Sequence, residues 1–186
     1  MDKRRKRETD SQMLNQSRKK EESYLILIIL MVIFRLVISL MEPYAIDMGG
    51  YLAWSRYLAN NGPFGLYSRF HIVYAPFYQY FLWISGLIAR FLGLSAFFHT
   101  LLIKLWSVLF EGLGALTIFR MAERANRRSI GFLAASCYLL NPGILMNSSV
   151  WGQFDSIPAT MLLAVIFLFE LKKRNAAALL FLVAVL

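Results

Sequence analysis

The sequence predicts an all-α integral membrane protein, a multi-spanning helical bundle with an external juxtamembrane helical loop. Hydrophobic residues make up 58% of the 186 positions and charged residues only 17%, and the mean hydropathy is +0.53. So few charges cannot cover the surface of a soluble protein of this size. Several windows also hold close to twenty apolar residues, about the length that crosses a bilayer as a helix.

The distribution of positive charge predicts how the chain is oriented in the membrane. The net charge of +9 would also suit a nucleic-acid-binding protein. Most of the Lys and Arg residues, however, lie in three clusters that each adjoin an apolar segment: 1–20, 120–128 and 172–174. Such clusters mark the cytoplasmic ends of membrane helices. We therefore expect a multi-pass protein of the cell membrane with a cytoplasmic N-terminus and no nucleic-acid partner.

The apolar segments divide the chain into a short arm and one membrane module. Residues 1–23 are polar and basic without apolar periodicity, and we expect a disordered cytoplasmic arm. Residues 24–186 are expected to form the N-terminal part of a transmembrane module with a kink at Pro142. The last apolar run is too short to span, so we expect a truncated chain. The expected spans are about 24–41, 100–119, 130–150 and 157–171, with a partial segment at 176–186.

The external loop, residues 42–99, is expected to hold two helices in the membrane interface, 50–60 and 76–93. Tyr51, Trp54 and Leu58 form an apolar stripe on the first one, and such a helix lies flat on a membrane. The second is also apolar enough to span. In that case the two later basic clusters would lie outside, so charge bias favours the interfacial alternative.

With an interfacial 76–93 segment, Asp47 and Asp155 both lie on the outer side. Asp is a preferred N-cap residue, so each could simply cap the helix that follows it. Arg35 and Glu111 are charges within spans, where unpaired charges are rare, and we expect them to form a structural intramembrane pair. A cavity-lining role is the alternative. Lys104 is expected to snorkel to the outer interface or to touch a lipid phosphate.

Residues 141–156 (Asn-Pro-Gly-Ile-Leu-Met-Asn-Ser-Ser-Val-Trp-Gly-Gln-Phe-Asp-Ser) resemble a motif of the polytopic GT-C glycosyltransferases. The relatives in question are bacterial proteins akin to dolichyl-phosphate-glucose glucosyltransferases and GPI mannosyltransferases. Two more segments follow the same order: residues 47–54 resemble the acidic motif of the first loop, and residues 74–80 a Tyr-Pro-Pro element. The chain departs from the family at Val73, where Asp is common, and at Ala75, which replaces a Pro.

This resemblance implies an inverting hexosyltransferase, incomplete in this fragment. It would move a mannose- or glucose-type sugar from a polyprenyl-phosphate donor to a lipid-linked or cell-envelope glycan acceptor on the outer face. The donor is already activated, so the enzyme needs a base for the acceptor hydroxyl and a cation for the leaving phosphate. The implied catalytic residues are Asp47, as the base, and Asp155. The implied substrate-binding residues are Trp151, Gln153, Arg69, His71, Arg56 and Tyr74.

Several alternatives stay open. For the external cations Arg56, Arg69, His71 and Arg90, contact with lipid headgroups is an alternative to binding the donor phosphate. No metal ligand is assigned. A divalent cation is left open as a cofactor, although Asp47 lacks the paired acid that would favour one. The rival function is a non-enzymatic polytopic transporter or flippase-like protein, although transporters place their broken helices near the bilayer midplane.

Overall fold

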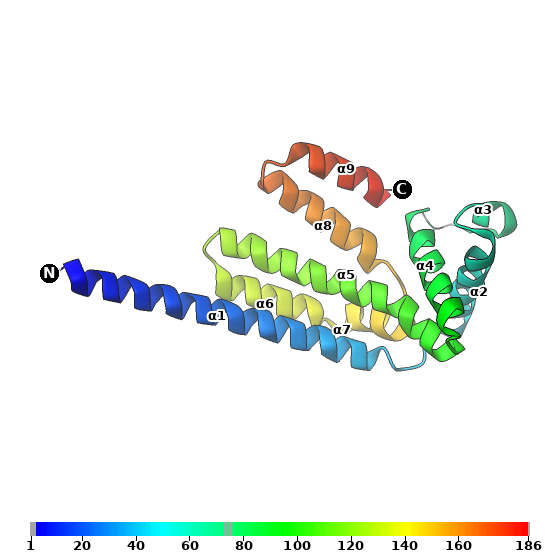
Figure 1. The fold of residues 1–186 in the computed structure, drawn as a ribbon, viewed down its shortest axis with the longest axis horizontal. Coiled ribbons are helices and arrows are strands. Elements are labelled where there is room, and N and C mark those ends of the chain that lie inside the picture. Colours follow the sequence, from blue (N-terminus) through cyan, green and yellow to red (C-terminus); the bar gives the residue numbers. More distant parts are fainter. Residues whose placement is uncertain (1–2, 73, 75, 186) are drawn as a thin grey trace.

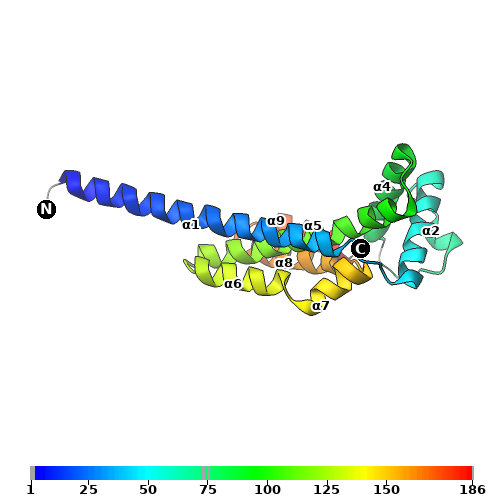
Figure 2. The ribbon, with the colours of Figure 1, turned by 90° about the horizontal axis from the view of Figure 1, so that it is seen from below.

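The helices of the chain form a lengthwise bundle and a pair that lies across one end of it (Figure 1). The computed structural model describes residues 3–72, 74 and 76–185, and this part is helical without strands. Figure 2 shows the same arrangement from below, with the N-terminal end of α1 extending beyond the bundle. The lengthwise helices are α1 (Lys3–Ile38), α5 (Ala96–Arg124), α6 (Arg128–Leu139), α8 (Ser156–Glu170) and α9 (Arg174–Val185).

The bundle is built around α5, which packs against α1, α6 and α8. A buried cluster including Ile28, Ala115 and Leu139 joins α1, α5 and α6. Of the described helices, α5 alone is long and apolar enough to cross a membrane. The pair formed by α6 and Pro142–Trp151 passes the same test when it is taken as one bent span.

The N-terminal arm differs from the disordered segment that its composition predicts. In the structure α1 begins at Lys3 and continues without a break to Ile38. The arm is rich in Lys, Arg, Glu and Gln, which are all good helix formers, and opposite charges four residues apart support a helix. The guanidinium of Arg18 lies 3.1 Å from Glu22 in such a pair.

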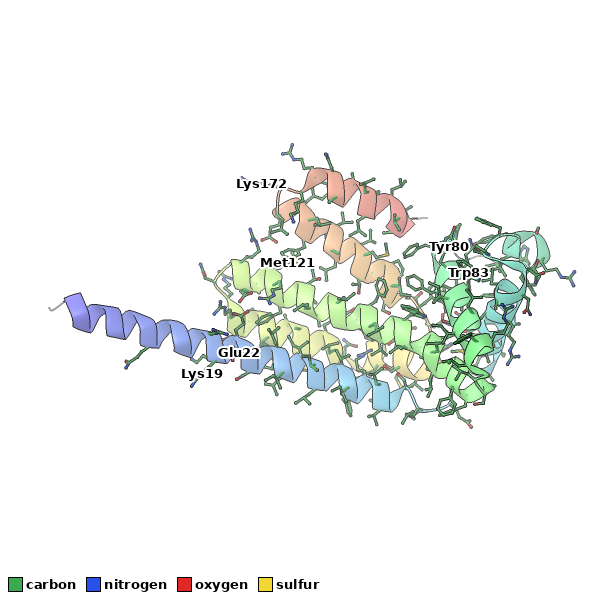
Figure 3. The ribbon with its side chains drawn as sticks, in the orientation of Figure 1. Lys19, Glu22, Tyr80, Trp83, Met121 and Lys172 are labelled. Carbon is green, nitrogen blue, oxygen red and sulfur yellow. The ribbon has the colours of Figure 1, made fainter. Side chains whose placement is uncertain are left out.

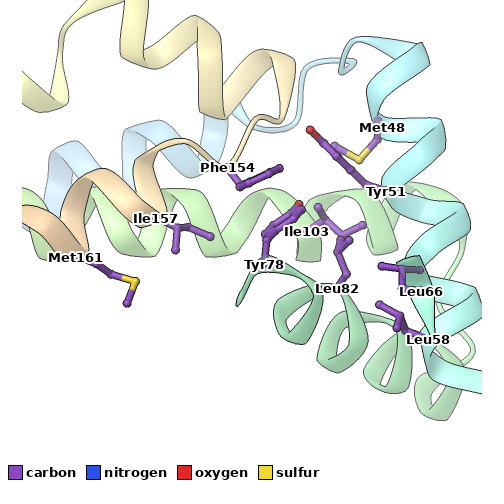
Figure 4. Close-up of a cluster of buried hydrophobic side chains, with 10 residues drawn as sticks. All are labelled: Met48, Tyr51, Leu58, Leu66, Tyr78, Leu82, Ile103, Phe154, Ile157 and Met161. Carbon is purple, nitrogen blue, oxygen red and sulfur yellow. The ribbon is translucent and has the colours of Figure 1, made fainter. Parts of the chain in front are cut away.

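The external loop forms α2 (Ala45–Asn61), the short α3 (Leu66–Arg69) and α4 (Phe77–Leu92). The expected helices 50–60 and 76–93 correspond to α2 and α4. The apolar stripe of α2 faces α4 and not lipid, because Tyr51 and Leu58 are 1% and 0% exposed within the main core cluster (Figure 4). The expectation of a lipid-facing stripe was wrong, since periodicity shows which side is apolar but not what covers it.

The chain breaks where the motif at residues 141–156 begins. Pro142 opens the short α7 (Pro142–Ile144), whose first N–H groups are capped by the Asn141 side chain. A π-helical turn, η1 (Leu145–Trp151), follows and ends at Gly152, whose φ of +96° favours glycine. The axis bends by 42° across this break, so the kink expected at Pro142 is present.

Candidate active site

Asp47 is held by two side chains from the far part of the chain. It lies in the first turn of α2, half-buried. The Trp151 indole N–H donates to its Oδ2 at 2.8 Å, and the Gln153 amide donates to the same oxygen at 2.5 Å. Both donors bind Oδ2, so Oδ1 keeps its lone pairs within the described part of the chain. The fold thus joins two segments that are more than a hundred residues apart.

The Tyr51 side chain orients the Gln153 amide, and further aromatic rings pack beside Tyr51. The Tyr51 hydroxyl donates to Gln153 Oε1 at 2.8 Å, which leaves the NH₂ end of the amide to face Asp47. Burial, together with a hydrogen bond to Tyr74, raises the pKa of Tyr51, so this hydroxyl stays a neutral donor. The Tyr51 ring meets Tyr78 and Phe154 edge-on, and these two rings stack on each other at a centroid distance of 3.5 Å.

The backbone that carries Trp151 and Gln153 is fixed from two sides. The Ser107 hydroxyl on α5 donates to the Gln153 carbonyl at 2.9 Å. From the segment before α2, the Tyr44 N–H donates to the Trp151 carbonyl at 3.3 Å, and the two rings lie 4.9 Å apart. The directions in which Trp151 and Gln153 point are therefore set by contacts with α5 and with the segment before α2.

Asp155 lies near the same end of the bundle but faces a different space. Its Oδ2 accepts a hydrogen bond from the Asn147 amide at 3.2 Å. With Asn147, Tyr138 and Glu111 it lines a cavity of about 220 Å³, which Asp47 does not line. Asp155 is the N-cap residue of α8, yet its side chain caps no N–H group. Asp47 also does not occupy the N-cap of α2, which is Tyr44, so the capping alternative is not realised at either position.

The expected pair of Arg35 and Glu111 is formed. Arg35 Nη2 lies 2.5 Å from Glu111 Oε2, and both side chains are fully buried. The same guanidinium donates to Ser148 Oγ at 2.9 Å and to the Leu139 carbonyl. Arg35 therefore ties α1 to α5, to the end of α6 and to η1, the element that presents Trp151.

Lys104 contradicts the prediction that it snorkels or meets a lipid phosphate. Its ammonium is buried and donates to the carbonyls of Met41 at 2.8 Å and Ser39 at 3.1 Å. These carbonyls lie at and just beyond the C-terminal end of α1, where backbone acceptors lack helical partners. A buried cation from α5 satisfies them.

The remaining predicted substrate-binding residues divide between the site and the surface. Tyr74 packs against Tyr51, and the two hydroxyl oxygens lie 3.3 Å apart. Arg69, the last residue of α3, and His71, in the segment after it, are exposed and form no hydrogen bond or ion pair with the described residues. Arg56 lies further along α2, in a separate cavity. Sequence reasoning missed Tyr51 as a partner of the site, although its position one turn after Asp47 was a usable signal.

Across the described ranges, no three His, Cys, Asp or Glu side chains are grouped so as to hold a metal ion. Comparison with known proteins found no matching family model, no matching curated protein and no matching solved structure.

Proposed function

We propose that the chain is part of a multi-pass membrane glycosyltransferase in which Asp47 is the general base. The enzyme moves a mannose- or glucose-type hexose from a polyprenyl phosphate to a lipid-linked or cell-envelope glycan on the outer face. The observation that carries the proposal is the Asp47 carboxylate held through Oδ2 by Trp151 and Gln153. A structural carboxylate needs no free oxygen, whereas a base needs one that is held in place and open to a substrate.

The reaction is a single displacement at the anomeric carbon of the sugar. The acceptor hydroxyl oxygen attacks C1 while the bond from C1 to the phosphate oxygen breaks, and this inverts the configuration. The hydroxyl proton passes to Asp47 Oδ1, and the polyprenyl phosphate leaves with the bonding electrons. Trp151, a residue that is 43% exposed, offers an apolar face to a sugar. Asp155 and its cavity would receive hydroxyl groups of the sugar or acceptor.

The charge distribution supports the proposed orientation. The turns α5–α6 and α8–α9 lie toward the end of the bundle where α1 begins, and both turns are basic (Figure 1). In Figure 3, Lys172 and Met121 lie at that end, and Tyr80 and Trp83 of α4 lie at the other. Basic turns mark the cytoplasmic side, so α2, α4 and Asp47 belong outside.

Replacement of the proposed base tests the reaction. We expect Asp47→Asn to lower kcat for hexose transfer by about 10²–10⁴-fold, the usual contribution of a general base. Binding of the radiolabelled polyprenyl-phosphate hexose by the purified protein should change little. Glu42→Gln, an exposed acid just before α2, is the matched control and should keep full activity. Equal losses of donor binding and transfer in Asp47→Asn would reject the role as base.

A transporter is the second candidate, because the helix broken at Pro142 and the buried pair of Arg35 and Glu111 are features of transporter cores. Reconstitution separates the two functions. The protein is placed in vesicles with labelled polyprenyl-phosphate hexose and a glycan acceptor. A glycosyltransferase forms labelled glycan. A transporter moves the labelled lipid to the other leaflet and forms none.

A further inference from the structure

A second polar cavity, of about 250 Å³, lies at the far end of the α2–α4 pair. The two helices run side by side in the same direction, since the Ser55 hydroxyl bonds the Leu82 carbonyl and Arg90 bonds the Ala59 carbonyl. The start of the pair carries Asp47, and its end carries this cavity. The polar lining residues are Arg56, Asn60, Arg90 and His99.

This cavity is too far from Asp47 to hold the phosphate of a reacting donor. Arg56 follows Asp47 by nine residues on one helix, which is about 13 Å along the axis and half a turn around it. A base must lie within hydrogen-bond reach of the hydroxyl that attacks C1. The phosphate of the same sugar is one bond from C1, so the cavity serves another ligand.

The cavity carries positive charge without a compensating acid. No carboxylate is among its lining residues. Arg90 Nη1 donates to the Ala59 carbonyl at 2.7 Å and to Asn60 Oδ1 at 3.1 Å, which are both neutral acceptors. Arg56 has no hydrogen bond or ion pair with any described residue. Two guanidinium groups that share a cavity repel each other, and an anion between them removes that cost.

Several N–H groups near the cavity are available to an anion. The Arg56 guanidinium donates to none of the described residues, and the Asn60 amide keeps its NH₂ because its oxygen already accepts from Arg90. The helix α5 also begins here, and its N-cap residue, Ser95, makes no side-chain bond to the first turn. Guanidinium, amide and free helix N–H groups together suit the oxygens of a phosphate.

The surface beside the cavity is strongly apolar. At the corner between α4 and α5, Phe91 is 88% exposed, Leu92 60%, Phe97 52% and Phe98 55%. Several exposed apolar side chains at one corner are typical of a membrane contact, and aromatic rings favour the interfacial zone. A phosphate in the cavity would lie next to this patch, as the phosphate of a phospholipid lies next to its acyl chains.

We propose that the Arg56–Arg90 cavity binds the phosphate headgroup of an anionic phospholipid, whose acyl chains lie along Phe91, Leu92, Phe97 and Phe98. The lipid holds the α2–α4 pair flat on the outer leaflet. This inference does not depend on glycosyl transfer.

Native mass spectrometry of the purified protein in maltoside micelles tests the site with phosphatidylglycerol as the probe. We expect one retained phosphatidylglycerol per chain, and phosphatidylcholine should bind more weakly. Arg56→Gln should weaken retention at least about tenfold, as loss of a charge-assisted hydrogen bond predicts. Arg69→Gln removes an exposed arginine outside the cavity that pairs with none of the described residues, and it should leave retention unchanged. Circular dichroism checks that both variants keep their helix content.

Two further experiments identify the source of the phosphate and can overturn the proposal. Inorganic phosphate at the same concentration should not displace the lipid, and complete displacement would assign the cavity to a soluble phosphate. The double change Phe91→Ser and Phe98→Ser leaves the cavity lining intact and should still weaken retention of phosphatidylglycerol. Equal effects of Arg56→Gln and Arg69→Gln, or no preference over phosphatidylcholine, would reject the lipid site.

Discussion

Gln153 determines how the Asp47 carboxylate is presented, because its amide serves two neighbours at once. Its oxygen accepts from Tyr51 and its nitrogen donates to Asp47. Reversing the amide would break both bonds, so Tyr51 fixes the direction of the donor. Trp151 donates to the same carboxylate oxygen, and the two bonds together select one orientation of the side chain.

Gln153→Glu tests this positioning role at nearly constant size. The glutamate can still accept from Tyr51, but it cannot donate to Asp47 and places a like charge beside it. We expect kcat for hexose transfer to fall by about 10–100-fold, the loss typical of a misoriented reacting group, with the KM for the donor little changed. Gln153→Ala should show the same split. Initial rates over a range of donor concentrations separate the two constants, and unchanged kcat in both variants would reject the role.

The sequence carried enough information to name most members of this site, but not its geometry. The motif resemblance indicated Asp47, Trp151 and Gln153, and the structure joins them. The resemblance also grouped Asp155 with them, whereas Asp155 faces the neighbouring cavity. Gly152 and the start of α8 turn the chain between these positions, and a linear motif does not show on which side each residue emerges.

Among the elements, α1 has more roles than its apolar pattern indicates. Its Arg35 side chain contacts α5 directly, and it also contacts the end of α6 and the middle of η1. A buried charge without a partner costs several kcal/mol. The break in the chain at Pro142 therefore depends on an arginine from another helix, which satisfies carbonyl groups that the broken ladder leaves free.

A double-mutant cycle tests the pair of Arg35 and Glu111. We expect Glu111→Gln to destabilise the protein by about 3 kcal/mol, because it leaves a buried guanidinium without its counter-charge. The double variant with Arg35→Gln should be less destabilised than the sum of the two single changes. Thermal unfolding in detergent measures all three, with Arg18→Gln in an exposed pair as a control of little effect. Additive losses would exclude the coupling.

Helix positions followed from the sequence more closely than helix environments did. The expected segments 100–119 and 157–171 correspond to α5 and α8, with α5 several residues longer at each end. Lys104 was assigned to the interface, and the structure buries it against the end of α1. The hydrogen-bond partners of a buried charge come from segments that are packed around it in the fold, so they cannot be predicted from the neighbouring sequence.

At the scale of the whole molecule, the fold places the basic turns at one end and the polar and aromatic side chains of α2 and α4 at the other. The N-terminal arm and both basic turns lie toward one end (Figure 1), whereas α2 and α4 cross the other. In the proposed topology this separation follows the two faces of a membrane. Asp47 and the Arg56–Arg90 cavity would then both act on the outer leaflet.

Labelling of single cysteines in intact cells tests this topology. The native Cys137 is first replaced by serine. Asn61→Cys lies at the exposed end of α2 and is preferred to position 62, where a φ of +88° favours glycine. We expect an impermeant maleimide to label position 61 but not Ser129→Cys, which lies in the first turn of α6, directly after the basic turn. Both should react after lysis, and labelling of position 129 from outside would overturn the orientation.

Two buried cations, Arg35 on α1 and Lys104 on α5, hold α1 against α5 at two positions along the helix. Contacts at two positions prevent α1 both from shifting along its axis and from rotating about it. One residue inserted between Ile28 and Arg35 would rotate the last turn of α1 by about 100° about the helix axis. Both the Arg35 contacts and the Lys104 contacts would then be lost. The same insertion before Lys19 would only lengthen the protruding arm. The position of the segment that leads from α1 to Asp47 is thus set by the length of α1 beyond Ile28.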